Sequence, residues 1–372
     1  MRFEFATAHR VLFGAGTVRD VPAAARMFGE RAILVRGSSA DRAAALKAAL
    51  LAAGVDCREF AVAGEPTVDL IRSAPRDADL VVAFGGGSVI DAGKAIAALI
   101  ANPGDPMEYL EVIGQARPLP RPAAPCIAIP TTAGTGSEVT RNSVLGSPEH
   151  RVKASMRSAS MLPRLAVVDP ELTYHLPRAV TASTGLDALT QLIEPYLSVK
   201  SNPMTDAVCV QGIPHAARAL PAVWEHPLDA AARDAMSFAA LLGGMALANA
   251  ALGAVHGFAA PIGGMFPAPH GAVCAALLPH VFEINLRASK DRSRFDEVAR
   301  LVTADPHATA REGVRWIADL CRKLEVPRLR SYGVTENDLP VLVEKAEQSS
   351  SMKGNPVILS REDLREIVSR AL

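Results

Sequence analysis

Short apolar runs alternate with longer helical patterns through the first half of the chain. Four runs read as buried strands: AILVRG (32–37), DLVVAFGGG (79–87), CIAIP (126–130) and RLAVVDP (164–170). After the first run, residues 41–54 carry Ala and Leu at helical spacing and stop at Gly54, a residue suited to a C-terminal cap. A second helix is predicted from about Ser88 to Ala101. This alternation predicts an α/β domain with a mostly parallel sheet.

The pattern changes in the second half, where long Ala- and Leu-rich segments separated by Pro and Gly replace the strand-like runs. We predict that this half is all-helical and ends in an amphipathic helix capped by Ser360. Pro170 and Pro177 bracket a short connector, because the residue before a proline disfavours the helical conformation. The predicted domains are therefore residues 1–175 and 176–372.

Length and charge narrow the class of protein. At about 150 residues per domain, 372 residues are consistent with two domains. The 39 basic and 39 acidic residues cancel, so no overall field would attract nucleic acid or an anionic membrane. Residues 235–282 carry no charged side chain and approach the length of a membrane span. Because this stretch is rich in Ala and Gly and contains Asn249 and His256, we predict a buried helix instead.

The cysteines and the N-terminus bear on the compartment. The five cysteines are far apart and show no C-x-x-C spacing: Cys57, Cys126, Cys209, Cys274 and Cys321. Such a set fits a reducing compartment. The N-terminal sequence MRFEFATAHRVLFGAG lacks the apolar core and cleavage site of an export signal. We expect a cytoplasmic protein.

Two loops that follow predicted strands consist of small and hydroxyl residues. Gly86, Gly87 and Ser88 open a helix, so backbone N–H groups and the positive end of the helix dipole would face a phosphate. The second loop, TTAGTGS, runs from Thr131 to Ser137. A plain structural turn is the alternative for each loop, and the first loop matches neither G-x-G-x-x-G nor a P-loop. Two such loops at successive strand ends favour a nucleotide site.

Polar residues inside the apolar half form a second candidate site. Asp187 and Gln191 are four residues apart and share one helix face, with Glu194 close to it. The glycines and prolines between His256 and His270 indicate that two separate elements carry these histidines. A carboxylate, an amide oxygen and two imidazoles would suit iron, zinc or manganese. The alternative is that each histidine is a hydrogen-bonded core residue.

Five segments together resemble the iron-containing (group III) alcohol dehydrogenase family: GGGSVIDAGKAI, PTTAGTGSEVT, VVDPEL, GLDALTQLIEPY and VHGFAAPIGGMFPAPHGAVCAALLPH. They stand in the family order, and the resemblance covers almost the whole chain. It implies a Rossmann-like N-terminal domain and a helical C-terminal domain, the dehydroquinate synthase-like fold, with NAD(P) and a divalent metal meeting in the cleft between them. It also implies reversible hydride transfer between a small alcohol and the nicotinamide, and a homodimer or larger assembly.

The resemblance assigns candidate nucleotide contacts. Gly86, Gly87 and Ser88 would hold the pyrophosphate, and Lys153 would lie near the nicotinamide ribose. The adenosine and ribose side would be lined by Thr131, Thr132 and Thr135. The same motifs add three candidate contacts, Asp91, Ser137 and Leu172.

The position after the first strand bears on the choice between NAD and NADP. Relatives that prefer NAD often carry an Asp there, which binds the ribose hydroxyls and repels a 2′-phosphate. Here Gly37 replaces it, with Ser38, Ser39 and Arg42 nearby as candidate phosphate ligands. We therefore expect that NADP(H) is accepted.

The family metal set, one Asp and three His, is matched only in part. Asp187, His256 and His270 match, whereas Gln191 stands where the family has its first His. A Gln oxygen is a weaker donor than imidazole for Fe²⁺ or Zn²⁺. Ala260 replaces a further active-site His of many relatives. These departures bear on metal affinity and the proton route, for which His280 is a candidate by type and packing is its alternative role.

The sequence supports three hypotheses about function. The first is a metal-assisted alcohol dehydrogenase or aldehyde reductase, in which Asp187, His256 and His270 hold a metal that acts on the substrate oxygen. The second keeps the hydride transfer without a metal, as in the similar maleylacetate reductases. The third is a catalytically weakened nucleotide-binding protein, suggested by Gln191 and Ala260.

Overall fold

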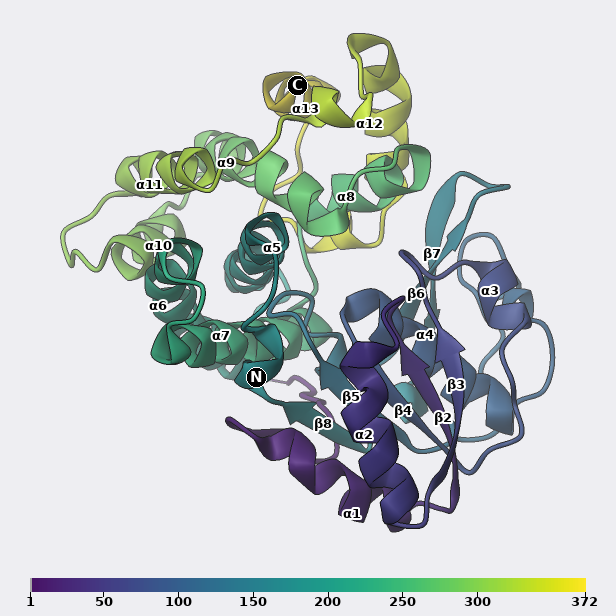
Figure 1. Cartoon of the computed structure of the whole chain (residues 1–372). Helices are drawn as coiled ribbons and strands as arrows, with labels where there is room; N and C mark the ends of the chain where they lie inside the picture. Colours follow the sequence, from purple (N-terminus) through teal and green to yellow (C-terminus); the bar gives the residue numbers. More distant parts are fainter. Residues whose placement is uncertain (1) are drawn as a thin grey trace. The chain divides into compact units, whose positions relative to one another are not determined.

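The structure is a computed structural model that describes residues 2–372, which divide by their contacts into two units (Figure 1). The α/β unit comprises Thr7–Thr132 and Gly136–Thr173. The helical unit comprises Ala133–Thr135, Tyr174–Leu372 and the N-terminal residues up to Ala6. The boundary between the two domains, predicted between residues 175 and 176, stays a prediction.

Residues 133–135 join the helical unit although the sequence suggested the first domain. Gly134 explains this assignment, because a Cβ there would lie 2.7 Å from the Cβ of Thr184. The loop backbone therefore packs directly on the start of the second half of the chain.

A parallel sheet organises the α/β unit. Within residues 2–372, six strands pair in the order β1-β8-β5-β4-β2-β3, and every pair is parallel. Their bounds are β1 (Val11–Phe13), β2 (Arg31–Arg36), β3 (Asp56–Ala61), β4 (Leu80–Gly85), β5 (Cys126–Pro130) and β8 (Leu165–Val168). The predicted mostly parallel sheet is confirmed. The sequence pattern did not predict β1, which has three residues, or β3, an edge strand with no fully buried residue.

Alternating residues of the strands supply two apolar cores, one on each face of the sheet. Ile33 and Val35 of β2 join the core that includes α3 and α4, whereas Ala32 and Leu34 join the core that includes α1 and α2. The helices are α1 (Val21–Arg26), α2 (Asp41–Ala52), α3 (Val68–Arg72) and α4 (Gly87–Ala101). Burying each Ile, Leu or Val side chain contributes about 1.5–3 kcal/mol, so the sheet needs a cover on both faces.

Gly54 ends α2 as predicted. Its φ of 80° lies in the left-handed region, where glycine carries no Cβ penalty. The N–H of Val55 donates to the carbonyl of Leu50 (2.9 Å) and that of Gly54 donates to the carbonyl of Leu51 (3.0 Å). These two bonds make a Schellman cap, which turns the chain from α2 toward the edge strand β3.

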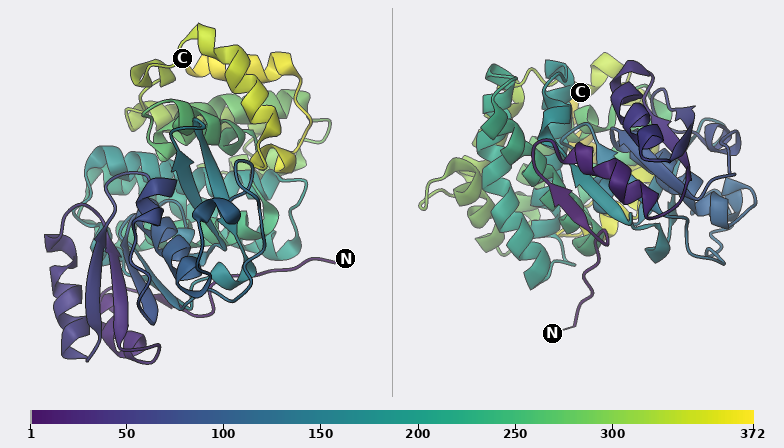
Figure 2. Two further views of the ribbon diagram at one scale, coloured as in Figure 1. Left: turned by 90° about the vertical axis from the view of Figure 1, so that its right-hand side faces the viewer. Right: turned by 60° about the horizontal axis from the view of Figure 1, so that its bottom comes forward.

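A two-stranded antiparallel ribbon follows β5 in the chain and lies outside the main sheet (Figure 2). It consists of β6 (Asn142–Ser147) and β7 (Val152–Arg157). Every second residue of β6 is buried, beginning with Ser143 and Leu145. The ribbon therefore covers part of the α/β unit with one face only.

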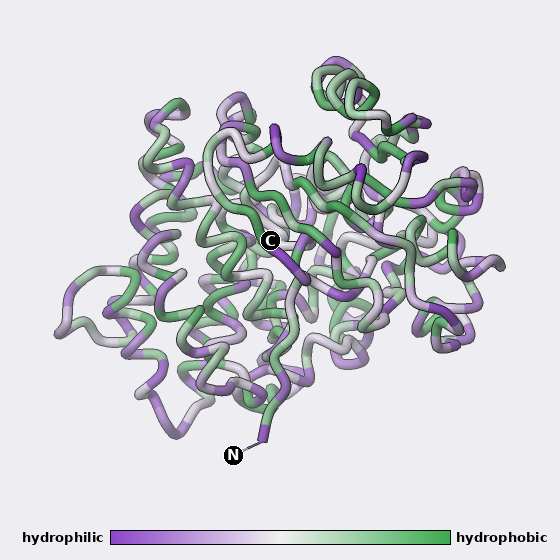
Figure 3. The backbone as a smooth tube through the Cα atoms, turned by 90° about the horizontal axis from the view of Figure 1, so that it is seen from below, coloured by the Kyte–Doolittle hydropathy of each residue, from purple (hydrophilic) through white to green (hydrophobic). Residues whose placement is uncertain are grey.

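Nine α-helices make up the helical unit in the described part of the chain. They are α5 (Arg178–Leu197), α6 (Pro203–Glu225), α7 (Ala230–Ala250), α8 (Ala254–Met265), α9 (His270–Ala288), α10 (Ser293–Thr303), α11 (Ala310–Lys323), α12 (Leu339–Gln348) and α13 (Arg361–Ala371). Hydrophobic and hydrophilic stretches alternate along several of them (Figure 3), as expected for helices that pack on one side. The predicted Ser360 cap of α13 is confirmed, because its side chain accepts from the N–H of Asp363 in a capping box.

The uncharged stretch of the sequence covers most of α7, all of α8 and most of α9. In residues 2–372 no single helix is long and apolar enough to cross a membrane. Helices α7 and α8 reach the length and apolar composition of a membrane span only when they are taken together. The chain bends by 98° at the break between them.

Candidate active site

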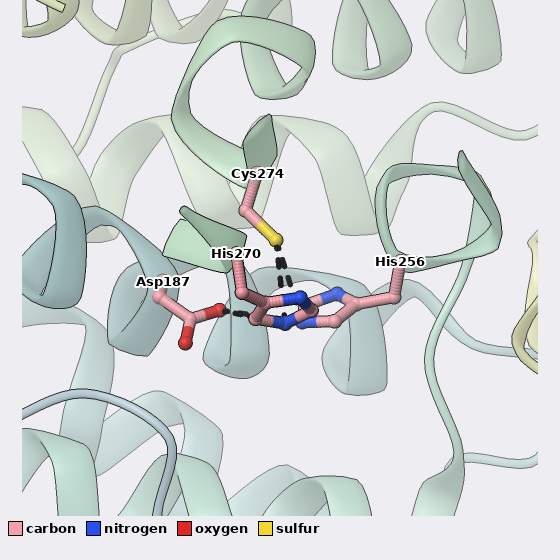
Figure 4. Close-up of side chains that lie close together, drawn as sticks. All are labelled: Asp187, His256, His270 and Cys274. Carbon is pink, nitrogen blue, oxygen red and sulfur yellow. Dashed lines mark hydrogen bonds and ion pairs between the residues drawn. The ribbon is translucent and has the colours of Figure 1, made fainter. Parts of the chain in front are cut away.

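Three helices of the helical unit bring Asp187, His256 and His270 together (Figure 4). Asp187 lies mid-way along α5, His256 near the start of α8 and His270 at the first position of α9. Gly271 allows this approach, because a Cβ there would lie 2.4 Å from the carbonyl oxygen of Ser183 on α5. The sequence prediction that two elements carry the histidines toward one point is confirmed.

The ligand atoms of this cluster lie close to one another. Oδ1 of Asp187 is 3.3 Å from Nε2 of His256 and 3.8 Å from Nε2 of His270. The sulfur of Cys274 lies 3.7 Å from Nε2 of each ring. The four candidate ligand atoms all lie within 4.8 Å of one another. We call Asp187, His256, His270 and Cys274 the donor cluster.

Cys274 was not among the candidates taken from the sequence. It lies four residues after His270 on α9, and residues four apart on a helix share a face. The same spacing directed attention to Asp187 and Gln191. A cysteine among Ala, Val and Leu also reads as an ordinary core residue, so the spacing alone did not identify it.

Glu194 fixes the orientation of the His256 ring. Its carboxylate accepts from Nδ1 of His256 (2.6 Å) and from the backbone N–H of Val255 (2.7 Å). Since a carboxylate can only accept, Nδ1 carries the proton and Nε2 faces Asp187. Asn355 also accepts from the N–H of Ala254 (3.1 Å), which holds the start of α8 in place. A carboxylate behind a histidine is the usual support of a metal-binding imidazole.

Charges within the donor cluster oppose the effect of burial. Burial raises the pKa of Asp187 and of Cys274, but the neighbouring His256 and His270 lower both pKa values below their ordinary ranges. Burial lowers the pKa of each histidine, whereas Cys274 and Asp187 raise both pKa values above the ordinary range. The neighbouring imidazoles therefore favour the ionised forms of the carboxyl and the thiol, and a bound cation would favour them in the same way.

Gln191 presents an unpaired oxygen next to this cluster. Its side chain is 2% exposed, and its Oε1 has no hydrogen-bond partner. An unsatisfied buried oxygen costs about 1–3 kcal/mol, which a ligand bond would remove. A hydrogen bond from Gln191 contributes to the lowered pKa of Asp187. The donors of this region, oxygen, nitrogen and sulfur, fit a divalent transition metal.

The predicted phosphate loop lies in the α/β unit between β4 and α4. Gly86 is the N-cap of α4, and no side chain caps the helix there. Gly85 is required by packing, because a Cβ would lie 2.5 Å from the Val89 side chain. At Gly86 a Cβ would make only ordinary 3.5 Å contacts with Thr132. Packing inside the protein thus requires glycine at position 85. No contact among the described residues requires it at position 86.

The end of the second predicted loop, Thr131 to Ser137, is held by hydrogen bonds to side chains of α4. The Asp91 carboxylate accepts from the hydroxyl of Ser137 and from the N–H of Val144 (2.9 Å). Lys94, fully buried, donates to the carbonyl of Ser137 and the hydroxyl of Thr140 (2.9 Å each). Asp91 therefore has a structural role that the sequence did not indicate, and Lys94 is a second residue that sequence reasoning missed.

The remaining candidate residues of the α/β unit are dispersed over its loops and ribbon. Lys153 on β7 pairs with Glu65 at 3.1 Å. Leu172 accepts a hydrogen bond at its carbonyl from Arg42 (3.1 Å). Gly37 follows β2, and a Cβ there would meet nothing within 4 Å.

Arg36 is the last residue of β2, beside the turn that follows, and His280 lies on α9 away from the donor cluster. Arg36 donates to the carbonyl oxygens of Gly37 (2.9 Å) and Ser38 (3.3 Å), so a guanidinium lies beside this turn. His280 lies on α9 ten residues after His270, and burial together with Arg370 lowers its pKa to about 4. His280 does not belong to the donor cluster, which favours its packing role.

Comparison with known proteins decides the family. The family model of iron-containing alcohol dehydrogenases matches residues 8–170, and the C-terminal model of the Fe-containing alcohol dehydrogenase family matches residues 181–372. The chain belongs to the iron-containing alcohol dehydrogenase family. The resemblance stated from the sequence motifs is thereby confirmed.

Individual relatives of this iron-containing alcohol dehydrogenase agree with that result. Alcohol dehydrogenase 4 of Saccharomyces cerevisiae is 39% identical over 300 residues, which cover 80% of this chain and 76% of that protein. A crystal structure of 1,3-propanediol oxidoreductase has a TM-score of 0.94 and 32% identity, with 100% of both chains covered. A sulfoacetaldehyde reductase from Bifidobacterium kashiwanohense in complex with NAD⁺ has a TM-score of 0.88 and 28% identity over 99% of this chain and 98% of that one.

Family membership makes the chain an oxidoreductase that acts on CH–OH groups. The predicted enzyme class and the fold, an α/β unit with a parallel sheet and an all-helical unit, are both confirmed.

Proposed function

We propose that this protein is a metal-assisted, NAD(P)-dependent alcohol dehydrogenase that also reduces the corresponding small aldehyde. The observation that carries the proposal is the meeting of the buried Asp187 and His256 with the partly exposed His270, supported by Glu194. No apolar packing requirement explains a carboxylate, two imidazoles and a thiol inside one helical core.

Asp187, His256 and His270 would hold the metal, Fe²⁺ or Zn²⁺, and the Oε1 of Gln191 would add an oxygen donor. A bound divalent metal supplies a Lewis acid for the substrate oxygen. Glu194 holds the His256 ring so that Nε2 faces the metal position. Burial of Asp187 and His256 excludes water from the reacting groups.

The loops of the α/β unit would bind the dinucleotide. Gly86, Gly87 and Ser88 offer backbone N–H groups at the uncapped start of α4, where the helix dipole favours a pyrophosphate. The missing Cβ of Gly86, which no protein contact demands, supports close approach of a ligand. Thr131, Thr132, Thr135, Ser137, Lys153 and Leu172 remain proposed contacts. The nicotinamide would exchange hydride with the carbon that bears the substrate oxygen.

We further propose that NADP(H) is accepted. The space around Gly37 would admit a 2′-phosphate, and Arg36 and Arg42 lie on either side of this turn in the sequence. Gly37→Asp would introduce a repelling carboxylate without a steric cost. The ratio of kcat/KM for NADPH to that for NADH should fall about tenfold or more, and an unchanged ratio would contradict the assignment.

Two alternatives are weaker. A reductase without metal would have no use for the donor cluster, and a weakened nucleotide-binding protein would not need the Glu194 support behind His256. The substrate would be a small alcohol or aldehyde, and a homodimer is the proposed assembly.

Metal content measured together with turnover tests the proposal. Protein purified without added metal, then loaded with Zn²⁺ or anaerobically with Fe²⁺, should bind about one metal per chain, and its aldehyde reduction should follow the loading. Asp187→Ala should remove both metal and activity and keep NADPH affinity. Asp319→Ala, an exposed aspartate on α11, is the matched control. Full activity of metal-free protein would move the function to the metal-independent reductases.

A further inference from the structure

The sulfur of Cys274 occupies a position that a metal ligand would occupy. For bonds of about 2.0–2.3 Å to nitrogen, oxygen and sulfur, ligand atoms at the corners of a tetrahedron are about 3.3–3.7 Å apart. The observed separations are 3.3 and 3.8 Å from Asp187 Oδ1 to the two Nε2 atoms, and 3.7 Å from Cys274 Sγ to each of them. Three of these four separations therefore lie within the range of a coordination tetrahedron, and the fourth exceeds it by 0.1 Å.

An ordinary buried cysteine makes different contacts. Cys321, on the neighbouring helix α11, donates to the backbone carbonyl of Ala275 at 3.5 Å. Cys274 instead directs its sulfur at both imidazole rings (Figure 4), and each of those nitrogens also faces Asp187. The thiol therefore shares the inner side of the cluster with the other three donors.

The sequence has a reason to supply a donor at this place. The imidazole that the family resemblance implies at residue 191 is replaced by Gln191, a weaker donor for iron or zinc. Asp187 and His256 come from separate helices, and His270 and Cys274 come from one turn of α9. One turn of α9 thus carries both a histidine and a thiol donor.

We propose that Cys274 is a metal ligand, so that Asp187, His256, His270 and Cys274 would hold the metal with one sulfur donor, and the weaker Gln191 oxygen would give way to the substrate oxygen. This inference rests on the proposed metal-assisted function and names a ligand beyond the set proposed there. On binding, the S–H bond breaks, its proton leaves to solvent, and a sulfur–metal bond forms. Because thiolate is a soft ligand, the site would favour Zn²⁺ or Co²⁺ over Mn²⁺ and Mg²⁺.

Cobalt substitution tests this ligand without relying on activity. The wild type, Cys274→Ser and Cys274→Ala are stripped with a chelator and titrated with Co²⁺ while the near-ultraviolet absorption is recorded. A sulfur-to-cobalt charge-transfer band is expected for the wild type and should vanish in both variants. Cys209→Ser, which changes a buried thiol elsewhere in the helical unit, should keep the band. Zinc affinity of Cys274→Ser should fall about 100-fold or more, since loss of a supporting residue alone costs about 10–100-fold.

The outcomes separate this inference from the proposed function. One Co²⁺ per chain that Asp187→Ala abolishes, with no sulfur band and unchanged affinity in Cys274→Ser, would overturn the sulfur ligand and leave the metal-assisted function in place. Failure of the wild type to bind any metal would overturn both. Near-ultraviolet circular dichroism reports whether the Cys274 variants keep their packing. If they do not, the wild type alone tests the proposal. A sulfur-to-cobalt band in the wild type supports the Cys274 ligand, and its absence overturns it.

Discussion

At the scale of single residues, the site depends on groups that face one another across helices. Asp187 and Gln191 could be paired from the sequence because both lie on one helix. His256 and His270 stood out as polar residues of the uncharged stretch, and the motif resemblance then supported them. The part played by Glu194 could not be derived in this way. Its bonds to His256 and Val255 bridge about sixty positions of sequence, and only the packing of α5 against α8 creates them.

Glu194→Gln tests whether this carboxylate orients the His256 ring. The amide keeps the size of the side chain and removes the charge that holds Nδ1–H, so zinc affinity is expected to fall about 10–100-fold with the fold intact. Competition with a zinc-binding dye measures the affinity. Glu225→Gln, which removes a surface partner of Lys323, should leave it unchanged. Equal affinities in all three proteins would mean that Glu194 only caps α8.

At the scale of elements, the sequence predicts a helix or strand correctly where the local pattern of apolar residues and glycines is enough to determine it. Helix α2 stops at Gly54 because a left-handed cap needs glycine, and α4 occupies nearly the predicted range. The ribbon of β6 and β7 was not predicted, since only alternate residues of β6 are buried and no continuous apolar run marks it. Assignment of residues 133–135 to the helical unit depends on contacts distant in sequence, which no local pattern carries.

Gly85 and Gly86 form a matched pair at the junction of β4 and α4. Gly85→Ala places a methyl group 2.5 Å from Val89 and should destabilise the α/β unit by about 1–3 kcal/mol. Gly86→Ala meets only 3.5 Å contacts and should fold normally but bind NADPH more weakly. Denaturant unfolding and NADPH fluorescence titration separate the two effects. Normal NADPH affinity in Gly86→Ala would remove this loop from the nucleotide site.

At the scale of the whole molecule, the two candidate sites belong to different units. The donor cluster lies entirely in the helical unit, and the predicted phosphate loop of Gly86, Gly87 and Ser88 lies entirely in the α/β unit. The formal charges cancel, 39 against 39, so overall repulsion contributes little to the pH dependence of stability near neutrality. Individual buried groups with displaced pKa values therefore govern it, and Glu138 is the clearest example outside the donor cluster.

Glu138 should make the α/β unit less stable as the pH rises. Burial raises its pKa from 4.5 to about 7, so between these values the unfolded chain is ionised and the folded chain stays protonated. Its contribution to stability is complete below pH 4.5 and is lost as the pH passes 7. Glu138→Gln removes this titration. The free energy of unfolding of the wild type minus that of Glu138→Gln, measured by denaturant titration, should fall by up to about 3 kcal/mol across that window. A constant difference would show that Glu138 is ionised in the folded protein at acidic pH. Its backbone hydrogen bond and the neighbouring Lys94, which both lower its pKa, would then have to outweigh the cost of burial.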